Sequence, residues 1–270
     1  MDTNSNQARR VVIGITAHVD AGKTTLAEAM LYRTGRLRKL GRVDHGSAAM
    51  DSHLLERERG ITIFSSQAEL PIGDLEVTLL DTPGHVDFSA EMERTLSVLD
   101  YAILVISGAD GVQAHTRTLW RLLELYRIPT FLFVTKMDFG RCGRGQMMEH
   151  LRHELGEGCV DFTPADRERR MEQLATCRED ALEAYLDGGE VPDALVRQLV
   201  GRRLVFPCWF GSGLKLEGID EFLEGLARYV QPPVYPETFS ARVFKISHDP
   251  QGKRLTHLKV TGGTLRVRDA

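Results

Sequence analysis

Five short apolar runs, separated by longer amphipathic segments, constrain the fold of this 270-residue chain more than any other feature. The runs are VVIGIT (11–16), VTLLDT (77–82), YAILVIS (101–107), TFLFVTK (130–136) and LVFPCWF (204–210). Near-continuous apolarity suits parallel strands that are covered by helices on both faces of a sheet. The alternation therefore predicts an α/β fold with a doubly wound, mostly parallel sheet and right-handed crossovers.

Helix-like segments lie between these runs. TTLAEAMLYRTG ends at Gly35, and Pro129 closely follows AHTRTLWRLLELYR. ITIFSSQAELPI (61–72) alternates loosely and leads into the next strand, which predicts an antiparallel edge strand. Residues 139–203 are charged and rich in arginine; we expect helices there, without a chemical motif. The charge run DRERRMEQ within them is typical of a solvated helix face rather than a binding patch.

Three prolines in QPPVYPET mark a linker. Beyond it the pattern changes to alternating strands around a Pro-Gln-Gly turn and a Gly-Gly turn, which is typical of an all-β structure. We therefore expect a flexible N-terminus (1–9), a main domain (10–230), the linker (231–238) and the first strands of a truncated β-barrel domain (239–270).

Composition narrows the choice of partners and compartment. Lys and Arg number 34 and Asp and Glu number 38, so the net charge is 34 − 38 = −4. No global basic field exists, and we expect no DNA binding; contacts with RNA must come from local patches or from parts outside this chain.

The four cysteines lack the spacing of a zinc site or a disulfide framework, which favours reduced thiols. No stretch approaches the roughly 18 apolar residues that span a membrane, and the polar N-terminus does not resemble a signal peptide. We expect a cytoplasmic monomer without membrane attachment.

AHVDAGKTT (17–25) directly follows the first strand and precedes a helix. In that context the motif predicts a P-loop, whose backbone N–H groups converge on phosphate oxygens. Gly22 permits a close backbone approach, Lys23 reaches the β- and γ-phosphates, and the Thr24 hydroxyl ligates Mg²⁺. A chance GKT is the alternative, because Ala stands where the pattern begins with Gly. The predicted phosphate-binding residues are Ala17, His18, Val19, Asp20, Ala21, Gly22, Lys23, Thr24 and Thr25.

DTPGH (81–85) begins 81 − 24 = 57 residues after Thr24, at the end of the second strand. Asp81 there lies on the sheet edge where open α/β sheets bind ligands, so it can hold Mg²⁺ through a water. The Gly84 N–H can bond a γ-phosphate. A lone Asp after a strand is more often a cap or turn residue, but the P-loop favours the metal role.

Five motifs occur in the order of the G motifs of translational GTPases: AHVDAGKTT, RERGITI (57–63), DTPGHVDF (81–88), TKMD (135–138) and FGSGLK (210–215). The chain resembles elongation factor G and, more closely, the tetracycline-resistance ribosomal protection proteins. LGRVDHGSAAMDSHLLERERGITI, SVLDYAILVISGADGVQAHTR and ARVFKI…LRVRD favour the latter. Asp138 and Gly211 are only 73 residues apart (211 − 138), whereas elongation factor G usually carries a longer insertion there.

The resemblance implies a Mg²⁺-dependent GTPase that converts GTP to GDP and phosphate. Thr62, in the switch I loop (35–62), matches a Mg²⁺ ligand, and His85 matches the residue that orients the attacking water, acting with Lys23 and Gly84. Val19 and Ile61 match the apolar gate beside that histidine. Asp20 matches a carboxylate that can help hold a monovalent cation. An isolated histidine is usually a surface or capped residue, but its place after DTPG favours catalysis.

The resemblance also implies a partner, the ribosome, whose sarcin–ricin loop docks against the histidine. We therefore expect slow intrinsic hydrolysis and strong stimulation by ribosomes. Catalysis would rest on positioning and charge neutralisation rather than on covalent chemistry.

At the base, Asp138 can accept hydrogen bonds from guanine N1–H and N2–H₂, and the Lys136 stem can lie over the base. Ser212, Gly213 and Leu214 form the loop near guanine O6, with Gly213 in place of the family's Ala. Thr135 replaces Asn; losing one neutral hydrogen bond costs about 1 kcal/mol, which weakens binding without reversing the base preference.

Three functions remain after these arguments. The first is a ribosome-dependent GTPase of the tetracycline-protection type, and the second is an elongation factor G-type translocase or related factor. The third is a non-hydrolysing GTP/GDP-binding switch, against which the intact phosphate and metal motifs argue.

Overall fold

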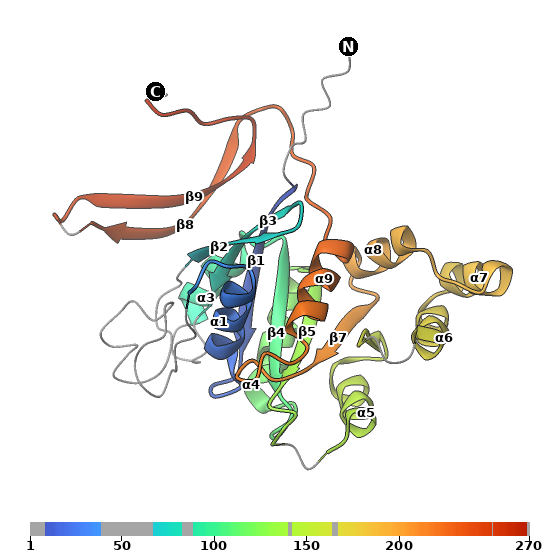
Figure 1. The fold of residues 1–270 in the computed structure, drawn as a ribbon. Coiled ribbons are helices and arrows are strands. Elements are labelled where there is room, and N and C mark those ends of the chain that lie inside the picture. The colour runs from blue at the N-terminus through green and yellow to red at the C-terminus, as the bar shows by residue number, and fades with distance from the viewer. Residues whose placement is uncertain are drawn as a thin grey trace.

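The computed structural model describes residues 9–38, 67–82, 89–139, 142–163, 167–249 and 251–268. A seven-stranded sheet forms the centre, in the order β2-β3-β1-β4-β5-β7-β6 (Figure 1). All neighbouring strands are parallel except β2 and β3, which are antiparallel. The strands are β1 Arg9–Ala17, β2 Gln67–Ile72, β3 Leu75–Asp81, β4 Tyr101–Ser107, β5 Thr130–Thr135, β6 Cys159–Asp161 and β7 Phe206–Phe210.

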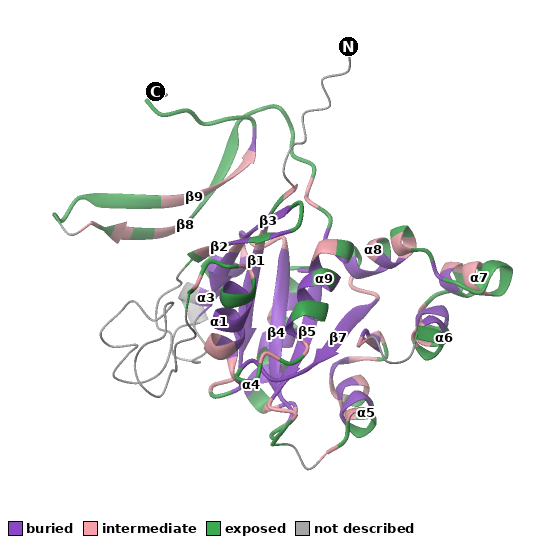
Figure 2. Ribbon diagram, viewed as in Figure 1, coloured by how far each residue is buried: buried purple, intermediate pink, exposed green. Residues whose placement is uncertain are grey.

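Helices cover both faces of this sheet, as the apolar runs predict (Figure 2). Every residue of β4 and β5 is buried, and their side chains alternate between two clusters. Phe131 and Phe133 pack on the side of α1 and α9, whereas Leu132 and Val134 pack on the side of α4 and α5. The helices are α1 Lys23–Arg33, α3 Ser89–Leu96, α4 Ala114–Leu125, α5 Arg144–Leu155, α6 Arg167–Cys177, α7 Glu179–Gly188, α8 Asp193–Gly201 and α9 Ile219–Tyr229.

The predicted doubly wound, mostly parallel α/β fold is confirmed, with shifts of one or two residues at strand ends. The antiparallel edge strand is present over 67–72; residues 61–66 lie outside the described part. Segment 139–203 contains α5 to α8 and also β6, a three-residue strand that the sequence did not predict. No helix in the described ranges is long and apolar enough to cross a membrane.

After the proline-rich segment, β8 (Ser240–His248) and β9 (Arg254–Gly262) form an antiparallel hairpin (Figure 1). Phe244 of β8 packs against Leu80 and Val98, beside the N-terminal end of β4. The Lys259 ammonium of β9 lies 2.5 Å from the Asp100 carboxylate. The hairpin is therefore tied to the sheet at the end opposite the P-loop.

Candidate nucleotide-binding site

The P-loop joins the carboxyl end of β1 to α1, which begins at Lys23. Gly22 caps this helix in the left-handed region (φ 92°), and Asp20 is also left-handed (φ 61°). A side chain at Gly22 would strain the loop, so glycine suits the turn. The first turn of α1 carries no acidic residue. Its N-terminal N–H groups and partial positive charge therefore favour an anion.

Lys23 and Asp81 form a buried ion pair beneath this loop. The Lys23 Nζ lies 2.6 Å from Asp81 Oδ1, and the two side chains are 8% and 0% exposed. Lys23 also donates a hydrogen bond to the Thr82 carbonyl. The Thr82 hydroxyl in turn donates to the Ile15 carbonyl at 2.8 Å, which ties the end of β3 to β1. The two charged groups predicted to serve phosphate and metal thus lie together.

The Thr135 hydroxyl bridges β5 to the P-loop. It donates to the Ala21 carbonyl, and the Ile106 carbonyl of β4 is a second acceptor at 3.2 Å. A hydroxyl has one hydrogen, so the two carbonyls share it. Thr135 is only 3% exposed. Threonine, which stands where the resembled family has asparagine, therefore joins β5 and β4 to the P-loop through its hydroxyl.

Lys136 and Asp138 follow at the end of β5. Lys136 has a left-handed backbone (φ 55°), and its Nζ donates to the Asp20 carbonyl at 2.6 Å. Its stem consequently spans from β5 to the P-loop. The Asp138 carboxylate, 10% exposed, lies 3.1 Å from the Lys215 ammonium. Lys215 belongs to the FGSGLK motif, but sequence reasoning gave it no role.

The loop after β7 packs against the start of α1. Ser212 and Glu217 exchange two backbone hydrogen bonds of 3.0 Å, which close the turn before α9. A Cβ at Gly213 would lie 3.2 Å from the Thr25 carbonyl carbon and oxygen, closer than ordinary contact. Ser212 is buried and Leu214 is half exposed. The structure thus brings the two predicted base-site segments, 135–138 and 212–214, together with the P-loop at one end of the sheet.

His18 of the P-loop faces His115, the second residue of α4. Their ring centroids are 5.8 Å apart in an edge-on arrangement. His115 is 8% exposed. It was not singled out from the sequence, although it follows GVQA (111–114), where the connection after β4 leads into α4. Val19 is half-buried. Four predicted site residues, Ile61, Thr62, Gly84 and His85, lie outside the described residues.

The metal predicted here fits the chemistry of the residues present. The Asp81 carboxylate and the Thr24 hydroxyl are the hard oxygen donors that Mg²⁺ prefers. Among the described residues no three His, Cys, Asp or Glu side chains gather as a metal cage. A small donor set is typical of Mg²⁺, which protein sites usually hold through one or two carboxylates together with substrate phosphates.

Comparison with known proteins agrees with this geometry. Residues 8–232 match the family "Elongation factor Tu GTP binding domain". The oxytetracycline resistance protein of Streptomyces rimosus is 39% identical and TetO of Campylobacter jejuni is 34% identical, over 96% and 95% of this chain. The chain spans 43% of the length of each of these relatives.

A solved structure extends the likeness to three dimensions. A crystal structure of a Thermus thermophilus protein superposes with a TM-score of 0.84 at 28% identity, over 95% of this chain and 46% of that one. The family match covers the whole sheet and every described site segment, from the P-loop to the loop after β7. This chain therefore belongs to the family of elongation factor Tu-type GTP-binding domains.

Proposed function

We propose that this chain is the N-terminal nucleotide-binding part of a ribosome-dependent GTPase of the tetracycline-protection type. The observation that carries the proposal is the buried pair of Lys23 and Asp81 beneath a P-loop whose base-site segments converge beside it. The relatives named for oxytetracycline and tetracycline resistance support the choice within the family. The proposed domain limits are those predicted from sequence, with the GTP-binding domain over 10–230 and the barrel strands over 239–270.

Lys23 would serve the phosphates by turning from Asp81 and the Thr82 carbonyl toward the β- and γ-phosphate oxygens. A buried ammonium in a low-dielectric site stabilises developing negative charge more strongly than one in water. The Gly84 N–H would add a hydrogen bond to the γ-phosphate. Backbone N–H groups of residues 17–25 would hold the remaining oxygens.

Mg²⁺ would be held by Thr24, Asp81 and Thr62, and when bound it neutralises charge on the β- and γ-phosphates. Asp81 becomes available for this role when Lys23 engages the phosphates. Asp20 would help to hold a monovalent cation at the loop. His85 would orient the attacking water behind the gate formed by Val19 and Ile61.

Guanine would be recognised by Asp138, whose carboxylate accepts from N1–H and N2–H₂. Adenine offers no such pair of donors, and a buried carboxylate left without partners is costly, so discrimination is steep. Lys136, held by the Asp20 carbonyl, would place its stem over the base. The backbone of Ser212–Leu214 would meet O6.

The partner we propose is the ribosome, with its sarcin–ricin loop set against His85, and the protein would act as a cytoplasmic monomer. The test is GTP hydrolysis by the full-length protein, with and without ribosomes. We expect strong stimulation, and we expect His85→Ala to keep GDP affinity while losing most of the stimulated turnover. Equal rates of GTP hydrolysis with and without ribosomes would contradict the proposal. Loss of GDP binding in His85→Ala would show that His85 has a structural role.

Drug resistance separates the two ribosomal functions. Expression of the full-length gene in a tetracycline-sensitive cell should raise the tolerated drug concentration, and His85→Ala should abolish the gain. A gene that supports GTP hydrolysis on ribosomes but gives no resistance would identify a translocase-type factor instead.

A further inference from the structure

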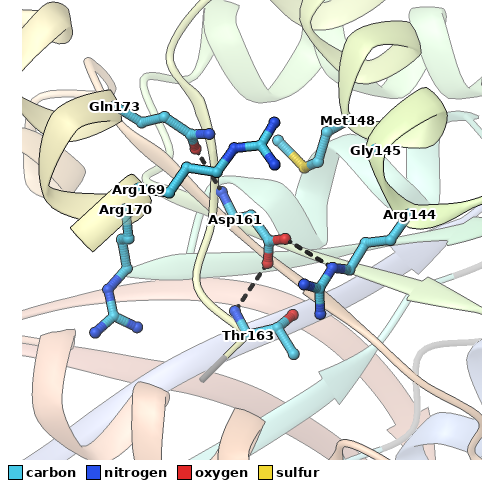
Figure 3. Close-up of a pocket in the computed structure, with 8 residues that line it drawn as sticks. All are labelled: Arg144, Gly145, Met148, Asp161, Thr163, Arg169, Arg170 and Gln173. Carbon is cyan, nitrogen blue, oxygen red and sulfur yellow. Dashed lines mark hydrogen bonds and ion pairs between the residues drawn. The ribbon is translucent and has the colours of Figure 1, made fainter. Parts of the chain in front are cut away.

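A second pocket, of about 340 Å³, lies at the carboxyl end of β6, where α5 and α6 both begin (Figure 3). Three arginines line it: Arg144 opens α5, and Arg169 and Arg170 lie in the first turn of α6. Asp161, Thr163 and Gln173 complete its polar wall. Strand β6 is the sheet edge beyond β7, so the pocket is separate from the P-loop.

The pocket lining has an excess of positive charge. Among the described residues that line it, the one carboxylate is Asp161, which is already engaged: Arg144 Nε lies 3.1 Å from Oδ2, and the Thr163 N–H donates to Oδ1 at 2.9 Å. Three guanidinium groups against this carboxylate give the described lining a formal charge of 3 − 1 = +2. The lining therefore favours an anionic ligand over a neutral or cationic one.

Hydrogen-bond donors of the pocket are also incompletely used. Arg170 is held in place by the Phe162 carbonyl at 3.3 Å and by the Phe162 ring, 5.5 Å from the guanidinium carbon. Its buried Nε, and the buried Thr163 hydroxyl, have no hydrogen-bond partner among the described residues. Buried donors in folded proteins are nearly always paired, so such groups call for an acceptor that the described residues do not supply.

Helix geometry adds to the charge. The first turn of α5 contains no acidic residue, and its N-cap residue, Gly143, has no side chain that could accept from the first-turn N–H groups. The Gly143 N–H itself donates to Gln146 Oε1 at 3.3 Å. Helix N-termini attract anions through these groups and through the helix dipole. The N-terminal turn of α6 lines the opposite wall of the pocket (Figure 3).

We propose that this pocket binds a phosphoryl group. Planar guanidinium forks match phosphate oxygens in bidentate geometry, and three guanidinium groups with the N-terminus of α5 suit an anion with several oxygens better than a single carboxylate. The volume lies within the range of small-ligand pockets, which leaves room for the group that carries the phosphate. The carrier is either the backbone of an RNA or a free phosphate-bearing molecule. The charge run DRERRMEQ thus contributes Arg169, Arg170 and Gln173 to a binding site as well as a solvated face.

The test uses the 270-residue chain with GDP and Mg²⁺ in saturating amounts, so that phosphate cannot enter the P-loop. One probe is inorganic phosphate, followed through the amide NMR signals of Gly145 and Thr163. The other is a fluorescein-labelled RNA hairpin, followed by anisotropy at increasing KCl. The variants are Arg144→Gln and Arg169→Gln, and Arg121→Gln on the exposed face of α4 is the matched control.

We expect phosphate to shift both amide signals. Each pocket variant should weaken phosphate binding about tenfold, because a charge-assisted hydrogen bond is lost, whereas Arg121→Gln should bind as the parent does. If RNA is the carrier, the hairpin binds and the slope of log affinity against log salt falls by about one in Arg169→Gln. If phosphate binds but the variants leave the affinity for the RNA hairpin unchanged, the carrier is a free phosphate-bearing molecule instead.

The proposal is wrong if phosphate leaves the Gly145 and Thr163 signals in place and RNA binding is the same in Arg169→Gln and Arg121→Gln. Arg144→Gln also breaks the ion pair with Asp161 and can affect folding. Arg169 is exposed, so its variant keeps the test decisive.

Discussion

At the scale of single residues, the Thr135 hydroxyl joins the end of β5, the proposed base site, to the P-loop. Its bond to the Ala21 carbonyl spans 114 residues of sequence. Loss of a neutral hydrogen bond between buried groups costs about 1 kcal/mol, and more when a carbonyl is left unpaired. The P-loop backbone therefore depends in part on a side chain from β5.

Thr135→Val tests this dependence, because valine has nearly the same shape without the hydroxyl. GDP affinity should fall about fivefold, in line with the loss of one hydrogen bond. Thr135→Ser is the matched control and should bind as the parent does. Thr135→Asn should bind equally well or modestly tighter. The measurement is the dissociation constant of a fluorescent GDP analogue; a large loss in Thr135→Asn would show that the site is built around threonine.

At the scale of elements, one carboxylate ties the hairpin β8–β9 to the sheet. Asp100 accepts from the Val12 N–H at 2.8 Å and the Tyr235 hydroxyl at 3.1 Å, besides its ion pair with Lys259. It thereby joins the start of β4, β1, the linker and β9. Burial lowers the pKa of Lys259, although the Asp100 charge opposes the shift. Burying the Lys259 ammonium therefore disfavours its charged form, and the attraction of the Asp100 carboxylate partly offsets this effect.

Lys259→Met tests the connection by removing the charge while keeping the apolar stem. Asp100 would then be a buried carboxylate without its cation, an arrangement that typically costs about 3 kcal/mol or more. The expected result is local: amide hydrogen exchange in β9 should quicken by roughly 100-fold while exchange in β4 and β5 stays slow. Lys253→Met, at the exposed hairpin tip, is the control.

The double variant Asp100→Asn/Lys259→Met should recover much of the loss, because both charges leave the interface together.

The lowered pKa of Lys259 also determines how docking of the hairpin should depend on pH. The docked hairpin binds fewer protons at Lys259 than the undocked one, so raising the pH toward 10.5 should favour docking in Asp100→Asn. Uniform acceleration of exchange throughout the sheet in Lys259→Met would refute a local role.

At the scale of the whole molecule, the sequence predicts those features that depend on runs of similar residues. The strands β1, β3, β4, β5 and β7 are apolar runs that the sequence reveals. Because the motifs follow the carboxyl ends of parallel strands, the P-loop, Asp81 and Asp138 are predicted to lie at the same end of the sheet. Strand β6 has three residues, too few for a periodic pattern. The residues that line the arginine pocket come from α5, β6 and α6, which only packing brings together, so no local sequence motif predicts the pocket.

Lys215 shows the same limit within a recognised motif. Its pairing with Asp138 depends on how the loop after β7 lies beside the end of β5, which the parallel pairing of Leu132 with Cys208 and of Val134 with Phe210 determines. Spacing alone predicts that these loops share an edge but not which side chains meet.

Because the proposed nucleotide contacts all come from one end of one sheet, GDP should stabilise the whole domain rather than a single loop. A ligand that binds only the folded state adds RT ln(1 + [L]/Kd), about 2.7 kcal/mol at 100 times Kd. For a domain of this size each kcal/mol raises the melting temperature by about 2–4 °C, so Mg²⁺ and GDP should raise Tm by roughly 5–10 °C.

Two comparisons make this thermal test specific. ADP at the same concentration should leave Tm unchanged, because Asp138 finds no matching donors on adenine. Lys23→Ala should lose most of the GDP effect, whereas Arg121→Gln, on the exposed face of α4 and outside the proposed site, should keep it. A shift with ADP equal to that with GDP would contradict guanine recognition by Asp138. A full GDP shift in Lys23→Ala would contradict the role of the buried lysine, since its charge would then contribute nothing to phosphate binding.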